Sequence, residues 1–244
     1  RLFIPEEGHT WGCFDYNQQE PRLVVHYASL QNLYGVDEVL EAYKKGDADF
    51  HSIVADMAEI PRYQAKTINL GLFYGMGKNK LQAELGVNKE RAQELFQQYH
   101  GRVPFVKQLM DAVMKRAQDS GKIRTLLGRL CRFHLWEPNY FGIHKALPHE
   151  QAILEHGPGI RRAYTYKALN KLIQGSAADM TKKAMIELYK AGIIPHIQVH
   201  DELDISVKDD KQSKQIVEIM ESAVGLEVPN KVDYESGKNW GDIK

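Results

Sequence analysis

Two aspartates lie at the ends of segments with strand-like patterns. Asp15 follows the apolar run at residues 11–14, and Asp201 lies between alternating segments at residues 196–199 and 203–207. Carboxylate oxygens are the ligands that hard divalent cations prefer. If the two strands are adjacent, the two side chains could hold two metal ions about 3.5–4 Å apart, which would clamp both the attacking and the leaving oxygen of a phosphoryl transfer.

Residues 196–207 predict a β-hairpin whose turn is His200-Asp201, with a second carboxylate, Glu202, beside it. The turn contains no glycine, but His and Asp are among the residues that tolerate a positive φ. Taken alone, an acidic turn is more typical of a solvated loop. The metal site therefore depends on the rest of the chain.

A helix predicted over residues 62–76 carries functional side chains at every fourth position. Because each step of four residues advances about 40°, one slanted stripe is formed by Arg62, Lys66, Leu70 and Tyr74. Two cations one turn apart suit a polyphosphate, and the tyrosine offers an aromatic face to a base. The apolar residues of the other side can pack inward: Ile68, Leu72 and Met76. Taken alone, the segment also fits an ordinary amphipathic helix with solvated cations.

These three motifs, in this order, resemble motifs A, B and C of the family A (polymerase-I-like) DNA polymerases. Motif A is Asp15-Tyr16-Asn17-Gln18-Gln19-Glu20-Pro21-Arg22, similar to the family's D-Y-S-Q-I-E-L-R. Motif B is Arg62-xxx-Lys66-xxx-Leu70-xxx-Tyr74-Gly75, and motif C is Gln198-Val199-His200-Asp201-Glu202. A fourth block, Gln174-Gly175-Ser176-Ala177-Ala178-Asp179, is similar to the family's Q-G-T-A-A-D. The resemblance covers nearly the whole chain, and the short link from His51 to Arg62 is closer to the phage members.

The resemblance implies an α+β fold: a polymerase palm, which is a small antiparallel sheet with helices, and helical fingers. The palm would comprise residues 1–35 and 165–244, and the fingers residues 36–164, with an insertion at residues 133–160. The thumb and exonuclease domains are absent from this chain. They would lie upstream, in the same or in a split polypeptide, and would be partners of this chain.

The implied function is template-directed DNA synthesis in replication or repair, with dNTPs and primer–template DNA as partners. Two Mg²⁺ ions, for which Mn²⁺ could substitute, would be held by Asp15, Asp201 and the Tyr16 carbonyl, and the catalytic set would add Glu202 and Lys66. The resemblance assigns these residues to the nucleotide: Gln18, Glu20, His51, Arg62, Lys66, Leu70 and Tyr74. It assigns these to DNA: Asn170, Gln174, His200 and Arg129.

Leu70 departs from the family pattern, which has Phe or Tyr at this position. An aliphatic side chain lacks the aromatic surface that would pack against the sugar and base of the nucleotide. We therefore expect altered fidelity and altered discrimination against sugar-modified nucleotides.

Composition limits the class of protein. The 244 residues are 43% hydrophobic and 26% charged, as in globular proteins, and no apolar run approaches the ~20 residues that span a bilayer. Cys13 and Cys131 have no zinc-binding spacing and cannot form a disulfide framework, which predicts a reducing, intracellular setting. The resemblance implies the cytoplasm of a bacterial cell or of a phage-infected host cell.

The formal net charge is zero, but basic residues cluster in two stretches. The first runs from Arg102 to Arg132. The second mixes basic and aromatic residues: Arg161, Arg162, Tyr164, Tyr166, Lys167 and Lys171. Both suit a nucleic-acid track, although solvated helix faces would give the same pattern.

The periodicity predicts a mainly helical chain with few strands. Helices are expected at about residues 19–33, 37–45, 49–58, 62–76, 79–85, 89–99, 103–119, 160–191 and 210–224, and strands at 10–15, 122–127, 194–200, 202–207 and 227–234. Gly121 and Gly192 are expected to end helices, and within residues 133–160 the stretches 136–140 and 156–159 look like loops.

Three other functions fit parts of the pattern. A single-subunit RNA polymerase shares the palm, the Lys/Tyr helix and a His-Asp turn, but Glu20 and Glu202 favour the DNA enzyme. A silent DNA-binding module would not need both aspartates together with Arg62 and Lys66. A metal-dependent phosphohydrolase would need further histidine ligands, for which no suitable spacing exists.

Overall fold

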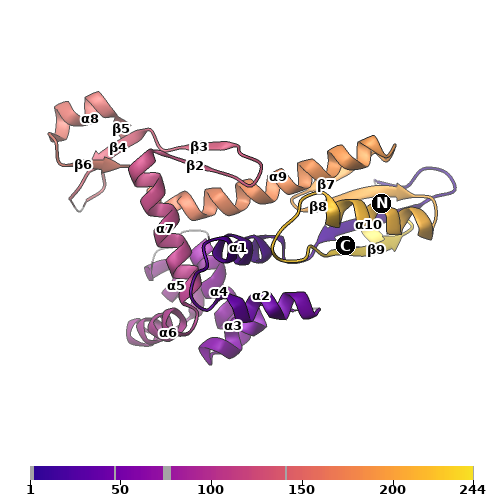
Figure 1. Ribbon diagram of the computed structural model, residues 1–244, viewed down its shortest axis with the longest axis horizontal. Coiled ribbons are helices and arrows are strands. Elements are labelled where there is room, and N and C mark those ends of the chain that lie inside the picture. Colours follow the sequence, from indigo (N-terminus) through magenta and orange to yellow (C-terminus); the bar gives the residue numbers. More distant parts are fainter. Residues whose placement is uncertain (1–2, 47, 74–77, 141, 244) are drawn as a thin grey trace.

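The computed structural model describes residues 3–46, 48–73, 78–140 and 142–243. It is an α+β structure with a four-stranded antiparallel sheet at one end and a group of helices at the other, joined by a long helix (Figure 1). None of the helices in the described ranges combines the length and the apolarity needed to cross a membrane.

The four-stranded sheet has the order β7-β8-β1-β9, in which every neighbouring pair is antiparallel. Its strands are β7 (Ile197–Val199), β8 (Glu202–Val207), β1 (Thr10–Tyr16) and β9 (Val232–Gly237). The predicted hairpin is confirmed, since β7 and β8 pair directly and His200 at the turn has a φ of 54°. The first strand of the sequence thus lies at the centre of the sheet.

The two faces of this sheet differ in polarity because strand side chains alternate. Phe14 lies opposite Leu203 and Tyr234, and this apolar face packs under α10 (Asp210–Ser222). Cys13, in contrast, lies opposite Asp204. The second face therefore carries polar side chains.

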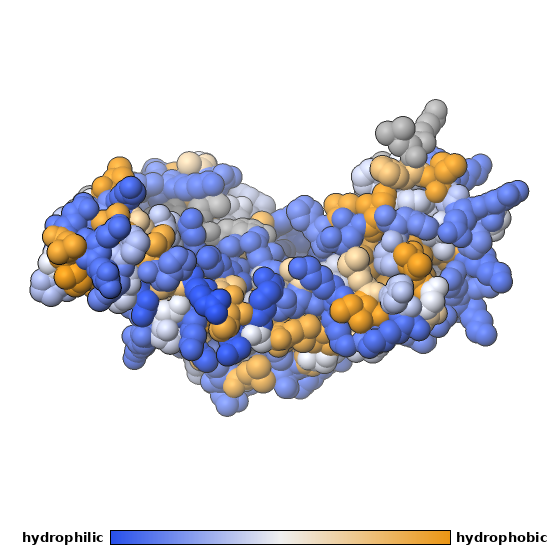
Figure 2. Space-filling view, turned by 90° about the horizontal axis from the view of Figure 1, so that it is seen from above, coloured by the Kyte–Doolittle hydropathy of each residue, from blue (hydrophilic) through white to orange (hydrophobic). Residues whose placement is uncertain are grey.

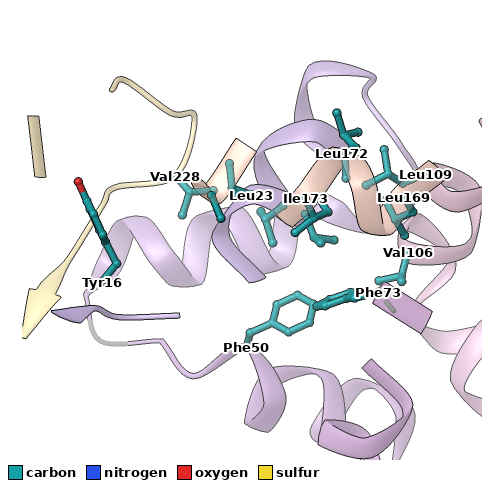
Figure 3. Close-up of a cluster of buried hydrophobic side chains, with 14 of the residues drawn as sticks. Tyr16, Leu23, Phe50, Phe73, Val106, Leu109, Leu169, Leu172, Ile173 and Val228 are labelled. Carbon is teal, nitrogen blue, oxygen red and sulfur yellow. The ribbon is translucent and has the colours of Figure 1, made fainter. Parts of the chain in front are cut away.

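The remaining helices form one continuous core with the sheet. They are α1 (Gln19–Leu30), α2 (Val36–Lys45), α3 (Phe50–Ala58), α4 (Arg62–Phe73), α5 (Lys78–Leu85), α6 (Lys89–Arg102), α7 (Pro104–Ser120) and α9 (Ala168–Lys190). Figure 3 shows side chains of α1, α3, α4, α7 and α9 packed together, with Phe50 and Phe73 beneath Ile173. The predicted helix stops are confirmed, since Gly121 and Gly192 follow α7 and α9 with φ values of 68° and 77°.

The helix predicted from residue 160 is wrong at its start. Residues Ile160–Arg162 form strand β6, Thr165–Lys167 form a short 3-10 helix (η1), and α9 begins only at Ala168. Tyr164 has a φ of 62°, which a continuous right-handed helix does not allow. Pairing of β6 with β4 holds the segment in this extended form.

The loop-like interpretation is wrong for residues 136–138, which belong to a strand, and confirmed for residues 157–159, which form a turn before β6. Residues 133–160 also hold further regular structure. They contain β4 (Leu135–Pro138), β5 (Leu147–Pro148) and α8 (His149–His156), which with β6 form a small-sheet unit of order β5-β4-β6. The Trp136 ring holds it together, with the Arg162 guanidinium 4.5 Å from the ring centroid and His149 packed edge-on. Strands this short carry no period that sequence analysis can detect.

The small-sheet unit lies at the end of the molecule away from the four-stranded sheet, beyond the hairpin of β2 (Lys122–Arg124) and β3 (Leu130–Arg132) (Figure 1). The visible surface is mostly hydrophilic, with apolar side chains scattered over it, some of them at this end (Figure 2). Ile143, Ile153 and Leu154 of the unit are exposed.

We predict that Phe14→Ala lowers the free energy of unfolding by about 3–5 kcal/mol, because a fully buried aromatic ring is replaced by a cavity. Phe14 lies at the centre of the apolar face, with its ring centroid 4.7 Å from that of Tyr234. Urea denaturation measures the change. Tyr34→Ala is the control, since this ring is 78% exposed and its removal should change stability by no more than about 0.5 kcal/mol.

Candidate active site

A cleft of about 950 Å³ opens between the turn of the β7–β8 hairpin, the start of α1, and helices α3, α4 and α9. Seven of the residues predicted to be functional line it: Gln18, Glu20, His51, Leu70, Gln174, His200 and Asp201. They come from five segments that are far apart in the sequence. The fold therefore gathers in one cleft residues from all four motifs, whereas Asp15, Arg62 and Lys66 are not among the lining residues.

The carboxylates are arranged by strand register. Asp15 of β1 lies opposite Glu202 of β8 and opposite Asp233 of β9, so all three side chains belong to the polar face of the sheet. Opposed residues of antiparallel strands have Cα atoms about 4.5–5.5 Å apart. Asp201 adjoins this row, because its carbonyl accepts a 3.4 Å hydrogen bond from the Tyr16 backbone N–H. Asp15 and Asp201 thus lie on adjacent chain segments, as predicted.

Asp233 is a member of this row that sequence analysis missed. Its carboxylate accepts a 2.7 Å hydrogen bond from Asn17 Nδ2 and lies 3.9 Å from Lys231 Nζ. The expected strand at residues 227–234 contained it, but only the register with β1 shows that it faces Asp15.

A buried polar group lies next to this row on the same face. Ligand atoms of Cys13, Glu202 and Asp204 are all within 4.8 Å of one another, and within the described residues this is the group of three that could hold a metal ion. The Cys13 thiol donates to Asp204 Oδ1 at 2.7 Å, and the Trp11 indole N–H donates to the same oxygen at 3.3 Å. Glu202 therefore belongs both to this group and to the row with Asp15.

Tyr16 contributes to the cleft through its backbone only. Its hydroxyl donates a 2.6 Å hydrogen bond to the Met220 carbonyl of α10, on the apolar side of the sheet. Burial, reinforced by the negative charge of Glu221, raises the pKa of this phenol well above its usual value. The side chain therefore anchors the end of β1, and only the carbonyl remains for the predicted metal contact.

Gln18 links the end of β1 to the helices. It has a left-handed φ of 52°, and its Oε1 accepts hydrogen bonds from the Phe50 backbone N–H at 2.8 Å and from the Tyr43 hydroxyl at 3.1 Å. Its Nε2 donates to the Ala48 carbonyl at 3.1 Å. The side-chain amide thus holds the start of α3 against the strand, and the expected contact with a nucleotide stays a prediction.

Arg22 also fixes the turn after β1 to neighbouring segments. Its Nε donates to the Asn17 carbonyl at 2.7 Å, one terminal nitrogen donates to the Pro229 carbonyl at 2.6 Å, and the guanidinium stacks 4.6 Å from the Tyr43 ring centroid. The turn after β1 is therefore tied to the segment before β9 as well as to α2.

The cations of α4 lie on its exposed side, as the helical spacing predicted, and Ile68 on the other side is fully buried. Arg62 Nε donates to Asp49 Oδ2 at 2.7 Å and to Ser52 Oγ at 3.2 Å. Tyr74, Gly75 and Met76 lie outside the described residues, and so does the side chain of Leu72. The interpretation of the stripe is therefore tested only as far as Leu70, which lines the cleft.

Asp49 is both the N-cap of α3 and the partner of Arg62. Partial burial raises the pKa of its carboxyl, but hydrogen bonds from Arg62 and Ser52 and the positive charge of Arg62 outweigh this and hold the pKa at about 2. One carboxylate thus joins the start of α3 to the start of α4.

The DNA contacts predicted on α9 differ in position. Gln174 lines the cleft, whereas Asn170 and Arg129 are not among the lining residues. Arg129 Nε donates to Asp179 Oδ1 at 3.0 Å, and its NH2 donates to the Gly175 carbonyl at 2.6 Å. This guanidinium fastens the β2–β3 hairpin to α9.

Gly175 permits that close approach, because a Cβ at this position would lie 2.7 Å from Thr125 Cγ2. The hairpin tip also donates from Leu126 N–H to Ser176 Oγ at 3.0 Å and from Leu127 N–H to Asp179 Oδ2 at 3.4 Å. Gly175 and Ser176 of the fourth motif therefore serve the packing of the hairpin against α9.

The second basic stretch, residues 161–171, forms a smaller mixed basic and aromatic surface than predicted. Arg161 pairs with Glu137 at 3.0 Å, and Arg162 donates to the Gln118 carbonyl of α7 at 3.0 Å and to the Phe133 carbonyl at 2.9 Å. Lys167 instead lies 5.3 Å and 5.6 Å from the exposed rings of Tyr164 and Tyr166. Only this last group has the mixed basic and aromatic surface that the sequence indicated.

Comparisons of the sequence and of the structure with known proteins all lead to one family of polymerases. The family model described as DNA polymerase family A matches residues 1–242. A DNA-directed DNA polymerase of Pseudomonas phage M6 is 36% identical over 98% of this chain, and a DNA polymerase I of Geobacillus stearothermophilus is 33% identical over all of it. Among solved structures, the POL domain of Pol1 from M. smegmatis, in complex with DNA primer-template and dNTP, superposes with a TM-score of 0.76 at 30% identity over 97% of this chain.

This chain spans only part of these relatives. It covers 39% of the phage protein, 27% of the Geobacillus protein and 41% of the M. smegmatis chain. The matched part contains all the segments that line the cleft.

We predict that Asp49 makes stability depend on pH in acid. Because its pKa is lowered in the folded state, its contribution is fully present above the unfolded value of about 4 and is lost as the pH falls through about 2. The contribution at pH 7 should be about 1–2 kcal/mol, less than the full shift implies, since Arg62 is half exposed. Asp49→Asn should flatten the unfolding free energy between pH 2 and 5 in urea denaturation.

Asp56→Asn is the matched control, because this aspartate lies on the same helix and is exposed. It should keep the wild-type slope. An unchanged slope in Asp49→Asn would contradict the assignment.

Proposed function

Because this chain belongs to DNA polymerase family A, we propose that it carries the nucleotidyl-transfer centre of a DNA-directed DNA polymerase. The proposed reaction is attack of a primer 3′-hydroxyl on the α-phosphorus of a dNTP, directed by a DNA template, with pyrophosphate as the leaving group. The observation that carries the proposal is the strand register that sets Asp15 opposite Glu202, with Asp201 beside them at the cleft. Replication or repair would be the cellular role.

The donor set on the polar face fits hard divalent cations, because it consists of carboxylates on adjacent strands. On this proposal Asp15 and Asp201, with the Tyr16 carbonyl, hold two Mg²⁺ ions, and Mn²⁺ could substitute. Bound ions would lower the pKa of the primer hydroxyl and neutralise charge on the leaving group. Glu202 is 5% exposed, and from this buried position it would restrain the orientation of the side chains around it.

The triphosphate would bind along the start of α4. Arg62 offers a planar fork and Lys66 a compact charge, and together they would stabilise the charge that develops on the transferred and leaving phosphates. Arg62 would exchange Asp49 for a phosphate when the nucleotide enters. His51 lines the same part of the cleft and would donate a further hydrogen bond.

The nucleoside would lie deeper in the cleft. Glu20, in the first turn of α1, lines the cleft and would crowd a ribose 2′-hydroxyl, which selects deoxynucleotides. Leu70 would face the sugar and base. Stacking by Tyr74 belongs to the proposal but lies outside the described residues.

Primer–template DNA is the proposed macromolecular partner. Gln174 and His200 both line the cleft, from α9 and from the hairpin turn, and would reach the minor groove next to the new base pair. The acceptors in that groove are alike for all correct pairs, so such contacts check the shape of a pair without reading its sequence. Asn170 of α9 and Arg129 of the β2–β3 hairpin would contact the DNA strand further from the cleft. A thumb region in the same or a split polypeptide would bind the rest of the duplex.

We predict that Asp201→Asn lowers primer extension at least ~10²-fold, because it removes a charged metal ligand. The assay uses a primed DNA template with dNTPs and Mg²⁺, on this chain and on the intact reading frame in parallel. Asp37→Asn, an exposed aspartate in the first turn of α2, is the control and should extend normally. Full activity of Asp201→Asn would refute the site, and no extension by the intact frame would favour a silent DNA-binding module.

We predict that Leu70→Phe lowers misincorporation about 2–10-fold and changes the use of dideoxynucleotides, because an aromatic contact adds about 0.5–1.5 kcal/mol of packing. Single-nucleotide kinetics with correct, mismatched and dideoxy substrates measure both. Leu70→Met conserves volume without adding a ring and should match the wild type. If Leu70→Phe changes neither ratio, Leu70 does not set fidelity.

A further inference from the structure

Three side chains from three helices form a buried hydrogen-bonded chain behind the cleft. The Tyr99 hydroxyl of α6 donates to Asn69 Oδ1 of α4, and Asn69 Nδ2 lies 3.1 Å from His51 Nδ1 of α3. Tyr99 and Asn69 are fully buried, and His51 is 8% exposed where it lines the cleft. The chain thus runs from the core of the helical part to the wall of the cleft.

The direction of these hydrogen bonds follows from the inventory of donors and acceptors. Burial raises the pKa of the Tyr99 phenol far above its usual value, so its O–H remains a donor. An amide oxygen can only accept, so the Asn69 oxygen faces Tyr99 and its NH₂ group faces the imidazole. An NH₂ group can only donate, and Nδ1 of His51 must then be unprotonated.

The reversed amide would require the opposite tautomer. Its NH₂ group would donate to the phenol oxygen, and His51 Nδ1 would have to carry a proton. The phenol proton of Tyr99 would then lack its acceptor, since Asn69 Oδ1 is the acceptor it has among the hydrogen bonds of the described residues. Leaving a buried donor without an acceptor is unfavourable, which favours the observed orientation.

The surroundings also keep His51 neutral. Desolvation lowers the pKa of the imidazole, and the positive charges of Arg62 and Lys66 lower it further, against an opposing effect of Asp49. A neutral imidazole with an unprotonated Nδ1 carries its single proton on Nε2. This leaves Nε2–H as the donor of the ring for a ligand in the cleft.

We propose that Asn69 and Tyr99 are positioning residues that fix His51 in its neutral, Nε2-protonated tautomer, so that it donates a hydrogen bond to an anionic oxygen of a bound triphosphate. The tautomer is a property of this chain alone, and only the identity of the acceptor rests on the proposed function. With Arg62 and Lys66 supplying positive charge nearby, His51 adds a directed donor without taking up a proton. The opposite tautomer would present a lone pair to the phosphate and repel it.

The first test measures the tautomer in the wild-type chain without nucleotide. Two-bond ¹H–¹⁵N correlation spectra of ¹⁵N-histidine-labelled protein distinguish protonated from unprotonated ring nitrogens, and His51→Gln assigns the signal. The expected result is an unprotonated Nδ1 and a protonated Nε2. A protonated Nδ1 would overturn the proposal, whatever the activity of the protein.

The second test reverses the direction of the hydrogen bond between residue 69 and His51. The carboxylate of Asn69→Asp can only accept, so it should draw the ring proton to Nδ1 and produce the opposite neutral tautomer, in which Nε2 is unprotonated and cannot donate to a phosphate. Tyr99→Phe frees the amide to rotate and should give a mixture of tautomers. Ile68→Val, a smaller change at the neighbouring buried position of α4, is the control for general loosening and should keep the wild-type spectrum.

The third test asks whether His51 meets a phosphate. Inorganic tripolyphosphate is added without DNA, and the Nε2–H signal of the wild type should shift while that of Asn69→Asp should not. An absent shift in the wild type would refute the hydrogen bond. This readout needs no polymerase activity, so it separates failure of this inference from failure of the proposed function.

Kinetics complete the test. Asn69→Asp should raise KM for dNTP about 10-fold, the loss expected for one hydrogen bond to a charged group, with a smaller effect on kcat and unchanged affinity for primer–template. In a His51→Ala background the same substitution should have no further effect on KM. An equal loss in both backgrounds would show that Asn69 supports the fold only, and would overturn the positioning role.

Discussion

The antiparallel register between β1 and β8 is the constraint on which the rest of the structure depends. It sets Asp15 opposite Glu202 and, two residue pairs further on the same face, Cys13 opposite Asp204. A shift by one residue would turn every side chain of β1 to the other face, which would bury the carboxylates under α10 and expose Phe14. The apolar packing of Phe14 against Leu203 and Tyr234 therefore fixes the carboxylates in place as much as their own contacts do.

The turn after β1 transmits this position to the helices. Gln18 bonds the start of α3, and Asp49, one residue before α3, bonds Arg62 at the start of α4. In both contacts a side-chain oxygen accepts a hydrogen bond at the start of a helix, from the Phe50 backbone N–H or from the Arg62 guanidinium. Donors at a helix start would otherwise lack partners. Hydrogen bonds of Gln18 and Asp49 thus connect the end of β1, which carries Asp15, with Arg62 of α4 through the start of α3.

Sequence analysis predicted those parts of the molecule that have a local signal. The hairpin at His200 was visible from alternation, and the exposed stripe of α4 from its four-residue spacing. Asp233, Asn69 and Tyr99 were missed, because their importance comes from register or from contacts between distant helices. The small-sheet unit was not predicted because its strands are too short to show a period. The start of α9 was misplaced because Tyr164, with a left-handed φ, interrupts what looked like one helix.

The contact between Arg62 and Asp49 has a consequence for the energetics of any anion that enters the cleft. The guanidinium is already neutralised by an internal carboxylate, and a phosphate that takes its place displaces that carboxylate rather than water. Such binding is an ion exchange, in which one pair is broken for each pair formed at this position. The net gain is then the difference between two similar interactions, which limits how tightly an anion is held at this position.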